Sequence, residues 1–210
     1  MSFHKTPLAL SVFLLGVLAL LALAGIYYFN STQYAGGGGL KAPETAPDAQ
    51  HVAVESEDAV FLKFSELSNA KTNFCAGPEV VVSSGAERLQ GSCCSKMDFH
   101  RYTEQLEGLK KYAFIGQIPA DPYDIPVSLA EKLLEYQKTI RLTAEQQRIY
   151  DDAVAMSHEG GPCCCKCWRW YAFEGLAKFL ITEHGFDAEQ IAEVWDLEDG
   201  CGGTGHAHSE

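Results

Sequence analysis

Residues 8–29 form a mostly apolar segment without a single charged side chain. At about 1.5 Å per residue, a helix of this length crosses a hydrocarbon core of roughly 30 Å. A helix buried in a soluble core normally keeps a polar face, which this segment lacks. We therefore expect a transmembrane helix here and a separate domain after it.

Two interpretations of this segment remain open, an uncleaved anchor and a secretory signal peptide. An anchor is favoured because cleavable apolar regions usually have about 7–15 residues. Tyr27 and Tyr28 also stand where interfacial aromatic residues lie in membrane anchors. In both cases residues 1–29 direct the rest of the chain out of the cytoplasm. We expect a single-pass protein of the cell membrane whose C-terminal domain is periplasmic or extracellular.

The rest of the chain divides by composition into a linker, a domain and a short tail. Residues 30–58 include four consecutive glycines followed by prolines, which is typical of a flexible linker. Residues 59–200 are predicted to form a mainly helical, cysteine-rich domain. Residues 201–210 form a Cys/His tail.

Apolar periodicity and capping residues predict a mainly α fold for this domain. The predicted helices cover residues 96–115, 127–140 and 143–156, then a segment from near Pro162 to Gly185, and a last one capped by Asp187. Thr143 with Gln146 has the spacing of a capping box, as has Asp187 with Gln190. The apolar runs at 60–62 and 80–82 suggest short strands or buried turns.

The charge balance excludes some classes of function. Lys and Arg number 16 against 28 Asp and Glu, so the formal net charge is −12. Nucleic acid is not expected as a partner, because phosphate binding needs a basic face. The chain also has no phosphate-binding glycine loop and no His-Glu-x-x-His motif, so hydrolase interpretations have no support.

The densest chemical signal is the run Pro162-Cys163-Cys164-Cys165-Lys166-Cys167. A proline suits the first turn of a helix, so we expect these thiols at a helix N-terminus, where the macrodipole favours thiolates. On a helix, Cys163 and Cys167 are neighbours, as are Cys164 and Cys167. Cys201 follows the last predicted helix and can fold back towards them.

A second cysteine motif precedes the helix predicted at 96–115. On a helix, Cys93, Met97 and His100 would form one stripe, with Cys94 beside it. Thiolate and imidazole ligands suit a soft or borderline ion, Cu(I) first and Zn(II) second. Met97 taken alone is better explained by core packing. The predicted metal ligands are Cys163, Cys164, Cys165 and Cys167, with Cys201, Cys93, Cys94 and His100 in second rank.

Disulfide chemistry is the main competitor, because an extracytoplasmic compartment is oxidising and the eight cysteines are an even number. The natural pairings are Cys75 with Cys93 or Cys94, and Cys201 with a member of the 163–167 run. Cys164 and Cys167 also fit a C-x-x-C redox motif, but the βαβ pattern of thioredoxin-like proteins is missing.

The cysteine run resembles the PCYCGC motif (Pro-Cys-Tyr-Cys-Gly-Cys) of a family of bacterial extracytoplasmic proteins. Pro162, Cys163, Cys165 and Cys167 match it, whereas Cys164 and Lys166 stand where that family has Tyr and Gly. The likeness covers residues 119–200 and is loose outside the motif. It implies an exported protein with a cysteine motif and does not identify the ligand.

These patterns favour a membrane-anchored, extracytoplasmic protein that binds a soft metal, with copper before zinc, for capture or delivery. Its expected partners are the membrane and a metal-donor or metal-acceptor protein. Binding is favoured over catalysis because no general acid or base is evident beside the thiols. The alternatives are a thiol–disulfide exchange protein and a disulfide-stapled interaction module.

Overall fold

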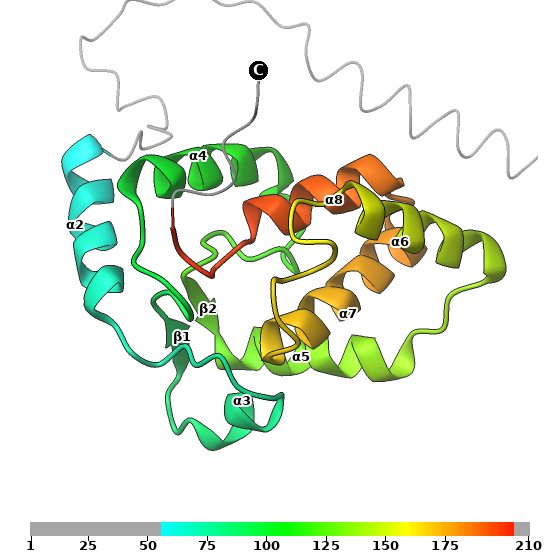
Figure 1. Ribbon diagram of the computed structural model, residues 1–210, viewed down its shortest axis with the longest axis horizontal. Helices are drawn as coiled ribbons and strands as arrows, with labels where there is room; N and C mark the ends of the chain where they lie inside the picture. Colours follow the sequence, from blue (N-terminus) through cyan, green and yellow to red (C-terminus); the bar gives the residue numbers. More distant parts are fainter. Residues whose placement is uncertain (1–55, 204–210) are drawn as a thin grey trace, which may run out of the picture. The chain divides into compact units, whose positions relative to one another are not determined.

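The computed structural model describes residues 56–203, which are mainly helical (Figure 1). The elements in chain order are α2 (Glu57–Asn69), α3 (Glu79–Ser83), β1 (Arg88–Gln90), α4 (Phe99–Leu109), the 3-10 helix η2 (Lys110–Tyr112), β2 (Asp124–Pro126), α5 (Val127–Thr139), α6 (Ala144–Met156), α7 (Trp168–Glu183) and α8 (Ala188–Leu197). None of the helices in this part of the chain has the length and hydropathy needed to cross a membrane. The predicted anchor, most of the linker and the tail beyond residue 203 lie outside the described residues.

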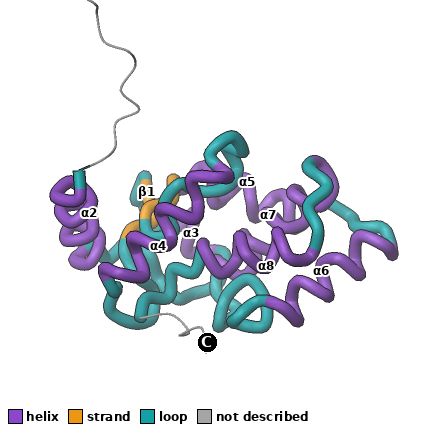
Figure 2. Tube along the Cα trace, turned by 90° about the horizontal axis from the view of Figure 1, so that it is seen from above, coloured by secondary structure: helices purple, strands orange, loops and turns teal. Residues whose placement is uncertain are grey.

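The hydrophobic core is built around α7, which packs along α5, while α6 packs along α8 (Figures 1 and 2). Helix α7 buries most of its length, including Trp168, Phe173 and Leu176. Gly175 explains how closely α5 approaches, since a Cβ on this residue would lie only 2.0 Å from the carbonyl oxygen of Leu133. The two backbones can touch only because residue 175 has no side chain.

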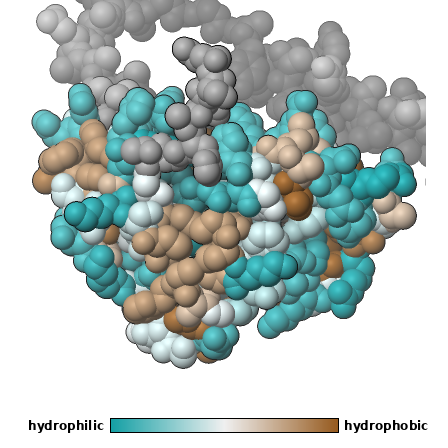
Figure 3. Space-filling view, viewed as in Figure 1, coloured by the Kyte–Doolittle hydropathy of each residue, from teal (hydrophilic) through white to brown (hydrophobic). Residues whose placement is uncertain are grey.

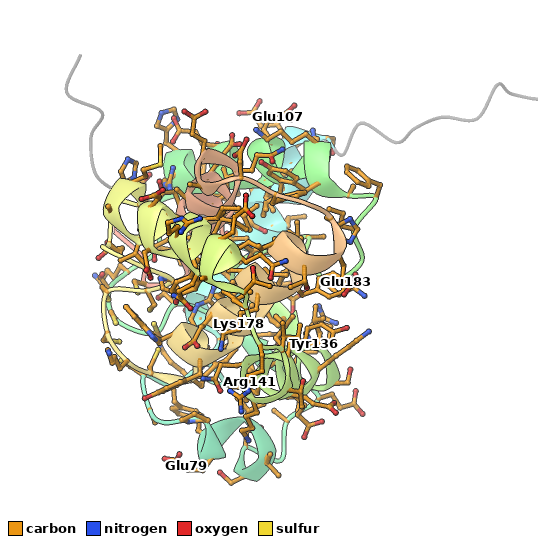
Figure 4. All side chains as sticks on the ribbon, turned by 90° about the vertical axis from the view of Figure 1, so that its right-hand side faces the viewer. Glu79, Glu107, Tyr136, Arg141, Lys178 and Glu183 are labelled. Carbon is orange, nitrogen blue, oxygen red and sulfur yellow. The ribbon has the colours of Figure 1, made fainter. Side chains whose placement is uncertain are left out.

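Polar and aromatic contacts also join α5 to α7. Tyr136 of α5 stacks on Phe179 of α7, with ring centroids 4.9 Å apart and an interplanar angle of 4°. Lys178 donates a 2.9 Å hydrogen bond to the carbonyl oxygen of Gln137 and lies 2.7 Å from a carboxylate oxygen of Glu174. Figure 4 shows Tyr136 and Lys178 on one side of the molecule.

Capping residues predicted two helices well, and apolar periodicity predicted a third. Helix α6 has the expected capping box of Thr143 and Gln146, and α8 has that of Asp187 and Gln190. Helix α5 covers nearly the whole segment predicted at 127–140. Gly185 follows α7 with a φ of +65°, the left-handed conformation expected of a residue that ends a helix.

Other predictions of secondary structure were wrong. The apolar runs at 60–62 and 80–82 form helices and not short strands or buried turns. They lie in α2, where Ser56 caps the N–H of Ala59, and in the short α3. The helix predicted at 96–115 begins only at Phe99, because Asp98 caps it, and ends at Leu109. Helix α7 begins at Trp168 and not near Pro162. These apolar runs of three residues are too short for their period to distinguish a strand from a helix.

A two-stranded antiparallel sheet, which the sequence did not predict, joins β1 to β2. Leu89 pairs with Ile125 in the register, and both side chains are buried. The ion pair between Arg88 and Asp124 adds a link at the edge of the sheet. The sheet fixes where the chain leaves β1, and the loop that follows carries Cys93 and Cys94.

Candidate metal centre

Four connecting segments of the fold bring all eight cysteines to one place. Cys75 lies between α2 and α3, the pair Cys93 and Cys94 lies between β1 and α4, the 163–167 run lies between α6 and α7, and Cys201 follows α8. In Figure 1 the red loop after α8 lies between α4 and β2, with the yellow segment that leads into α7 beside it. The site is therefore made by loops that the helices and the sheet hold in place.

Backbone hydrogen bonds align the Cys93 segment with the loop after α8. The N–H of Cys93 donates to the carbonyl oxygen of Gly200 at 3.2 Å, and the N–H of Cys94 donates to that of Cys201 at 3.3 Å. The approach depends on Gly202, because a Cβ there would lie 2.3 Å from the carbonyl oxygen of Ser95. Its φ of +83° also favours glycine.

Asn73 links three of the contributing segments and is 5% exposed. Its side-chain oxygen accepts a 3.1 Å hydrogen bond from the indole N–H of Trp168. Its side-chain amide donates a 2.7 Å hydrogen bond to the carbonyl oxygen of Gly91, which follows β1. The loop of Cys75, the exit of β1 and the start of α7 are thereby held together.

The dense cysteine run is a turn that leads into a helix, which corrects the prediction that it forms the helix N-terminus itself. Only Cys167 lies at that terminus, as the N-cap residue of α7. Gly161 precedes the run with a φ of +142°, and a Cβ there would lie 2.6 Å from the ring of Trp170. The sulfurs of Cys163 and Cys167 still approach to 3.9 Å, through the turn and not through a helical face.

The thiol sulfurs lie within a few ångströms of one another across the segments. The Sγ–Sγ distances are 3.1 Å for Cys75 and Cys165, 3.2 Å for Cys164 and Cys201, 3.6 Å for Cys163 and Cys201, 3.6 Å for Cys93 and Cys94, and 3.9 Å for Cys93 and Cys201. All eight cysteines are free thiols. The predicted approach of Cys201 to the 163–167 run is confirmed.

The site has a buried side and an open side. Cys163, Cys167 and Cys201 are buried, whereas Cys75, Cys94 and Cys164 are exposed. A cavity of about 830 Å³ opens on the exposed side, and Cys75, Cys93, Cys94, Lys71, Lys96 and Phe74 are among its lining residues. Figure 3 shows a hydrophobic area on the face where these segments meet in Figure 1.

The pKa values of two neighbouring thiols, Cys163 and Cys167, are shifted in opposite directions. The pKa of Cys167 is lowered, first because the Cys163 thiol hydrogen-bonds to it and next because Cys93 does. Backbone N–H groups at the start of α7 add to this lowering, as expected at a helix N-terminus. The pKa of Cys163 is raised, first by its hydrogen bonds with Cys167 and Cys201 and then by burial. These shifts favour ionisation of Cys167 over that of Cys163.

A buried arginine supplies positive charge beneath the thiols. Arg169 is 1% exposed and lies over the rings of Trp168 and Phe173. It donates a 2.6 Å hydrogen bond to the carbonyl oxygen of Glu198. Its guanidinium interacts electrostatically with thiols that include those of Cys93 and Cys163. This charge favours thiolates on the buried side of the site.

The carboxylate of Glu198 lies near this arginine without a direct bond. Glu198 is 2% exposed, and neither carboxylate oxygen has a hydrogen-bond partner among the described residues. Burial raises the pKa of Glu198 well above its usual range, and the charge of Arg169 offsets only part of this effect.

The predicted second motif does not form a helical stripe, although Met97 lines the cavity together with Cys93 and Cys94. Cys93 and Met97 precede α4, so the predicted helical stripe of Cys93, Met97 and His100 is wrong. Met97 packs against the aromatic cluster that contains Tyr102, as core packing predicted. His100 is exposed, pairs with Glu104 at 3.2 Å and belongs to none of the groups of close thiols.

Sequence reasoning missed Cys75 as a candidate metal ligand. Its sulfur is close to those of Cys165 and Cys167, although 90 residues separate it from Cys165 in the chain. The only available signal was the even number of cysteines, which gave Cys75 a partner in the 93–94 pair instead.

The donor set fits a soft metal ion. Each of the four groups of three cysteines in the described residues has its sulfurs within 4.8 Å of one another, close enough to share an ion. Thiolates prefer soft and borderline ions over hard oxygen-seeking ions such as Ca²⁺ or Mg²⁺. Comparisons with protein-family models, with curated proteins and with solved structures gave no match.

Proposed function

We propose that this protein captures a soft metal ion, Cu(I) in preference to Zn(II), and delivers it to a partner protein. The observation that carries the proposal is the convergence of eight free thiols from four separate segments. Packing alone does not require cysteine at eight positions, three of which are exposed. Sulfur donors at these separations are the ligands that soft ions select.

The place of action follows from the sequence. The apolar segment at 8–29 anchors the chain, and the linker at 30–58 tethers the thiol domain outside the cytoplasm. The resemblance to the PCYCGC family supports the same extracytoplasmic location. In an oxidising compartment, bound Cu(I) would also protect the thiols from disulfide formation.

Capture and delivery fit the site better than catalysis. The cavity beside the thiols is lined by cysteines, lysines, serines, Asn73 and apolar side chains. The cysteines are donors for a soft ion, and none of the lining side chains offers a carboxylate or imidazole for proton transfer. The exposed thiols give a partner protein direct access to the metal. Transfer would then proceed by exchange of one thiolate ligand for another.

Metal analysis of the full chain tests the proposal. The protein is purified in detergent under reducing conditions, loaded with Cu(I) or Zn(II), desalted and assayed by elemental analysis. We expect retained Cu(I) in at least equimolar amount and tighter retention of Cu(I) than of Zn(II) in competition. His100→Ala is the matched control and should retain as much copper as the unchanged chain, since His100 lies outside the thiol groups. Failure to retain either metal would overturn the proposal.

A thiol–disulfide exchange protein is the second candidate, favoured by the 3.1 Å approach of Cys75 to Cys165. An exposed thiolate would attack a partner's disulfide, and the second thiol would resolve the mixed disulfide, leaving the partner reduced by two electrons. The predicted C-x-x-C pair is not the closest one, because Cys164 lies nearest to Cys201. Reversible oxidation of Cys75 and Cys165 by a protein disulfide, with no metal retained, would favour this candidate.

A further inference from the structure

The thiol groups of the site overlap. The four groups are Cys75, Cys165 and Cys167; Cys93, Cys94 and Cys201; Cys94, Cys164 and Cys165; and Cys163, Cys164 and Cys201. Together they contain all eight cysteines, and four of these belong to two groups each. The shared residues are Cys94, Cys164, Cys165 and Cys201.

Three of the four thiol groups are linked to one another in pairs by shared cysteines. Cys94, Cys164 and Cys201 each join two of the same three groups, so those three groups are linked in a ring. Cys165 attaches the fourth group, which contains Cys75. A thiolate sulfur has several lone pairs and bridges two soft ions when both are within reach. Four separate single-ion sites would not share ligands in this way.

We propose that the eight cysteines hold several Cu(I) ions, up to one for each group, in a single thiolate-bridged polynuclear centre. This inference rests on the proposed function and specifies how many ions the site takes. One tetrahedral ion uses about four thiolates, which would leave the other cysteines without a role. Each thiol that binds releases its proton to solvent, and copper remains Cu(I) throughout.

The charges around the site suit such a centre. Eight thiolates exceed the charge of the few monovalent ions that they bind, so the loaded centre is negative. Arg169 supplies a compensating charge on the buried side, where it acts on Cys93, Cys163 and Cys201. Lys71 and Lys96 line the cavity on the open side. These lysines are local positive charges on a chain whose net charge is −12.

The difference in burial among the cysteines sets the direction in which ions enter the centre. The group of Cys163, Cys164 and Cys201 has two buried members, whereas Cys75 and Cys94 are exposed at the cavity. An ion therefore enters at the cavity and moves inward through the shared thiols, each step exchanging one sulfur ligand for another. The ion at the group of Cys163, Cys164 and Cys201 is therefore retained most tightly. An ion at the group of Cys94, Cys164 and Cys165, which has no buried member, exchanges with solution.

Copper stoichiometry of the full chain tests the inference. The reduced, metal-free protein in detergent is titrated with Cu(I) against a competing chelator, and the copper bound per chain is measured by native mass spectrometry and elemental analysis. We expect more than one and at most four ions, with copper–copper scattering in the X-ray absorption spectrum. One ion per chain without such scattering would overturn the polynuclear centre and leave the proposed function standing. No bound copper would remove both.

A pair of cysteine variants sharpens the test. Cys75→Ser and Cys164→Ser both alter exposed thiols, so the fold should persist, which circular dichroism checks. Cys75 belongs to one group and Cys164 to two. We expect the Cys164 variant to lose about twice as many ions as the Cys75 variant. Equal losses, or none, would contradict bridging, and bound iron with inorganic sulfide instead of copper would overturn the assignment.

Discussion

The backbone N–H of Trp168 donates a 2.7 Å hydrogen bond to the carbonyl oxygen of Ala76. The first residue of α7 is thus joined directly to the loop that carries Cys75. Because Cys167 precedes Trp168 and Cys75 precedes Ala76, this one bond brings two distant cysteines towards the same site. The candidate metal centre therefore depends on the fold as much as on the cysteine run.

Removal of the Asn73 side chain should destabilise the domain and weaken the site together. Asn73→Ala leaves the indole N–H of Trp168 and the carbonyl of Gly91 without their partner. A buried polar group left without its hydrogen bond costs about 1–3 kcal/mol. Urea denaturation should show a loss of this size in the free energy of unfolding, and copper binding should weaken. The control is the exposed Asn69→Ala, which should change the free energy of unfolding by less than about 0.5 kcal/mol.

A methyl group at position 175 should separate α5 from α7. Gly175→Ala places a Cβ 2.0 Å from the carbonyl oxygen of Leu133, so the helices must move apart. Overpacking of this kind costs about 1–3 kcal/mol or more, although alanine is otherwise the better residue in a helix. The control is Gly116→Ala, whose Cβ would meet nothing within 4 Å. Equal melting temperatures for the two variants would contradict the close contact.

The buried carboxyl group of Glu198 should make stability fall with rising pH. The pKa of Glu198 is raised in the folded state. Its contribution to the free energy of unfolding is therefore fully present below the unfolded-state pKa of about 4.3 and is lost as pH rises through the folded-state pKa. Glu198→Gln lacks this dependence. In the reduced, metal-free chain we expect the variant to gain stability relative to the unchanged protein between pH 4 and pH 7, as measured by urea denaturation.

Glu193 provides the control of opposite sign. Its pKa is lowered: burial opposes the shift, and the bonds from Lys111 and Tyr112 outweigh burial. Its stabilising contribution is therefore present above its unfolded pKa and is lost as pH falls through the folded value. Glu193→Gln should lower stability near pH 7 and have little effect in acid. The same pH trend in both variants would contradict the assigned environments.

Oxidation should reveal which thiols are neighbours. In the metal-free chain, mild oxidation is expected to link Cys75 to Cys165 and Cys164 to Cys201, whose sulfurs lie 3.1 and 3.2 Å apart. Peptide mapping by mass spectrometry identifies the links. Prior loading with Cu(I) should prevent both, because the sulfurs are then occupied. A dominant link between Cys75 and Cys93 would contradict the arrangement of the loops.

Local signals in the sequence predicted the elements that local chemistry controls. The capping residues of α6 and α8 act within one turn, so Thr143 and Asp187 could be recognised without the rest of the fold. The run from Cys163 to Cys167 likewise marked the centre of the site. The run at 80–82 has no side-chain cap, whereas the run at 60–62 lies in a helix whose N-cap, Ser56, was a local signal that the prediction did not use.

The sequence by itself determined that this chain carries a helical domain with a concentrated set of soft ligands. Only the tertiary structure decided that Cys75 joins that set and that His100 does not. Contacts between segments far apart in the chain, such as that of Trp168 with Ala76, leave no periodic trace in either segment. The relative positions of the four loops follow from burial of α7 against α5 and from the hydrogen bonds of Asn73, which form only when the whole domain folds.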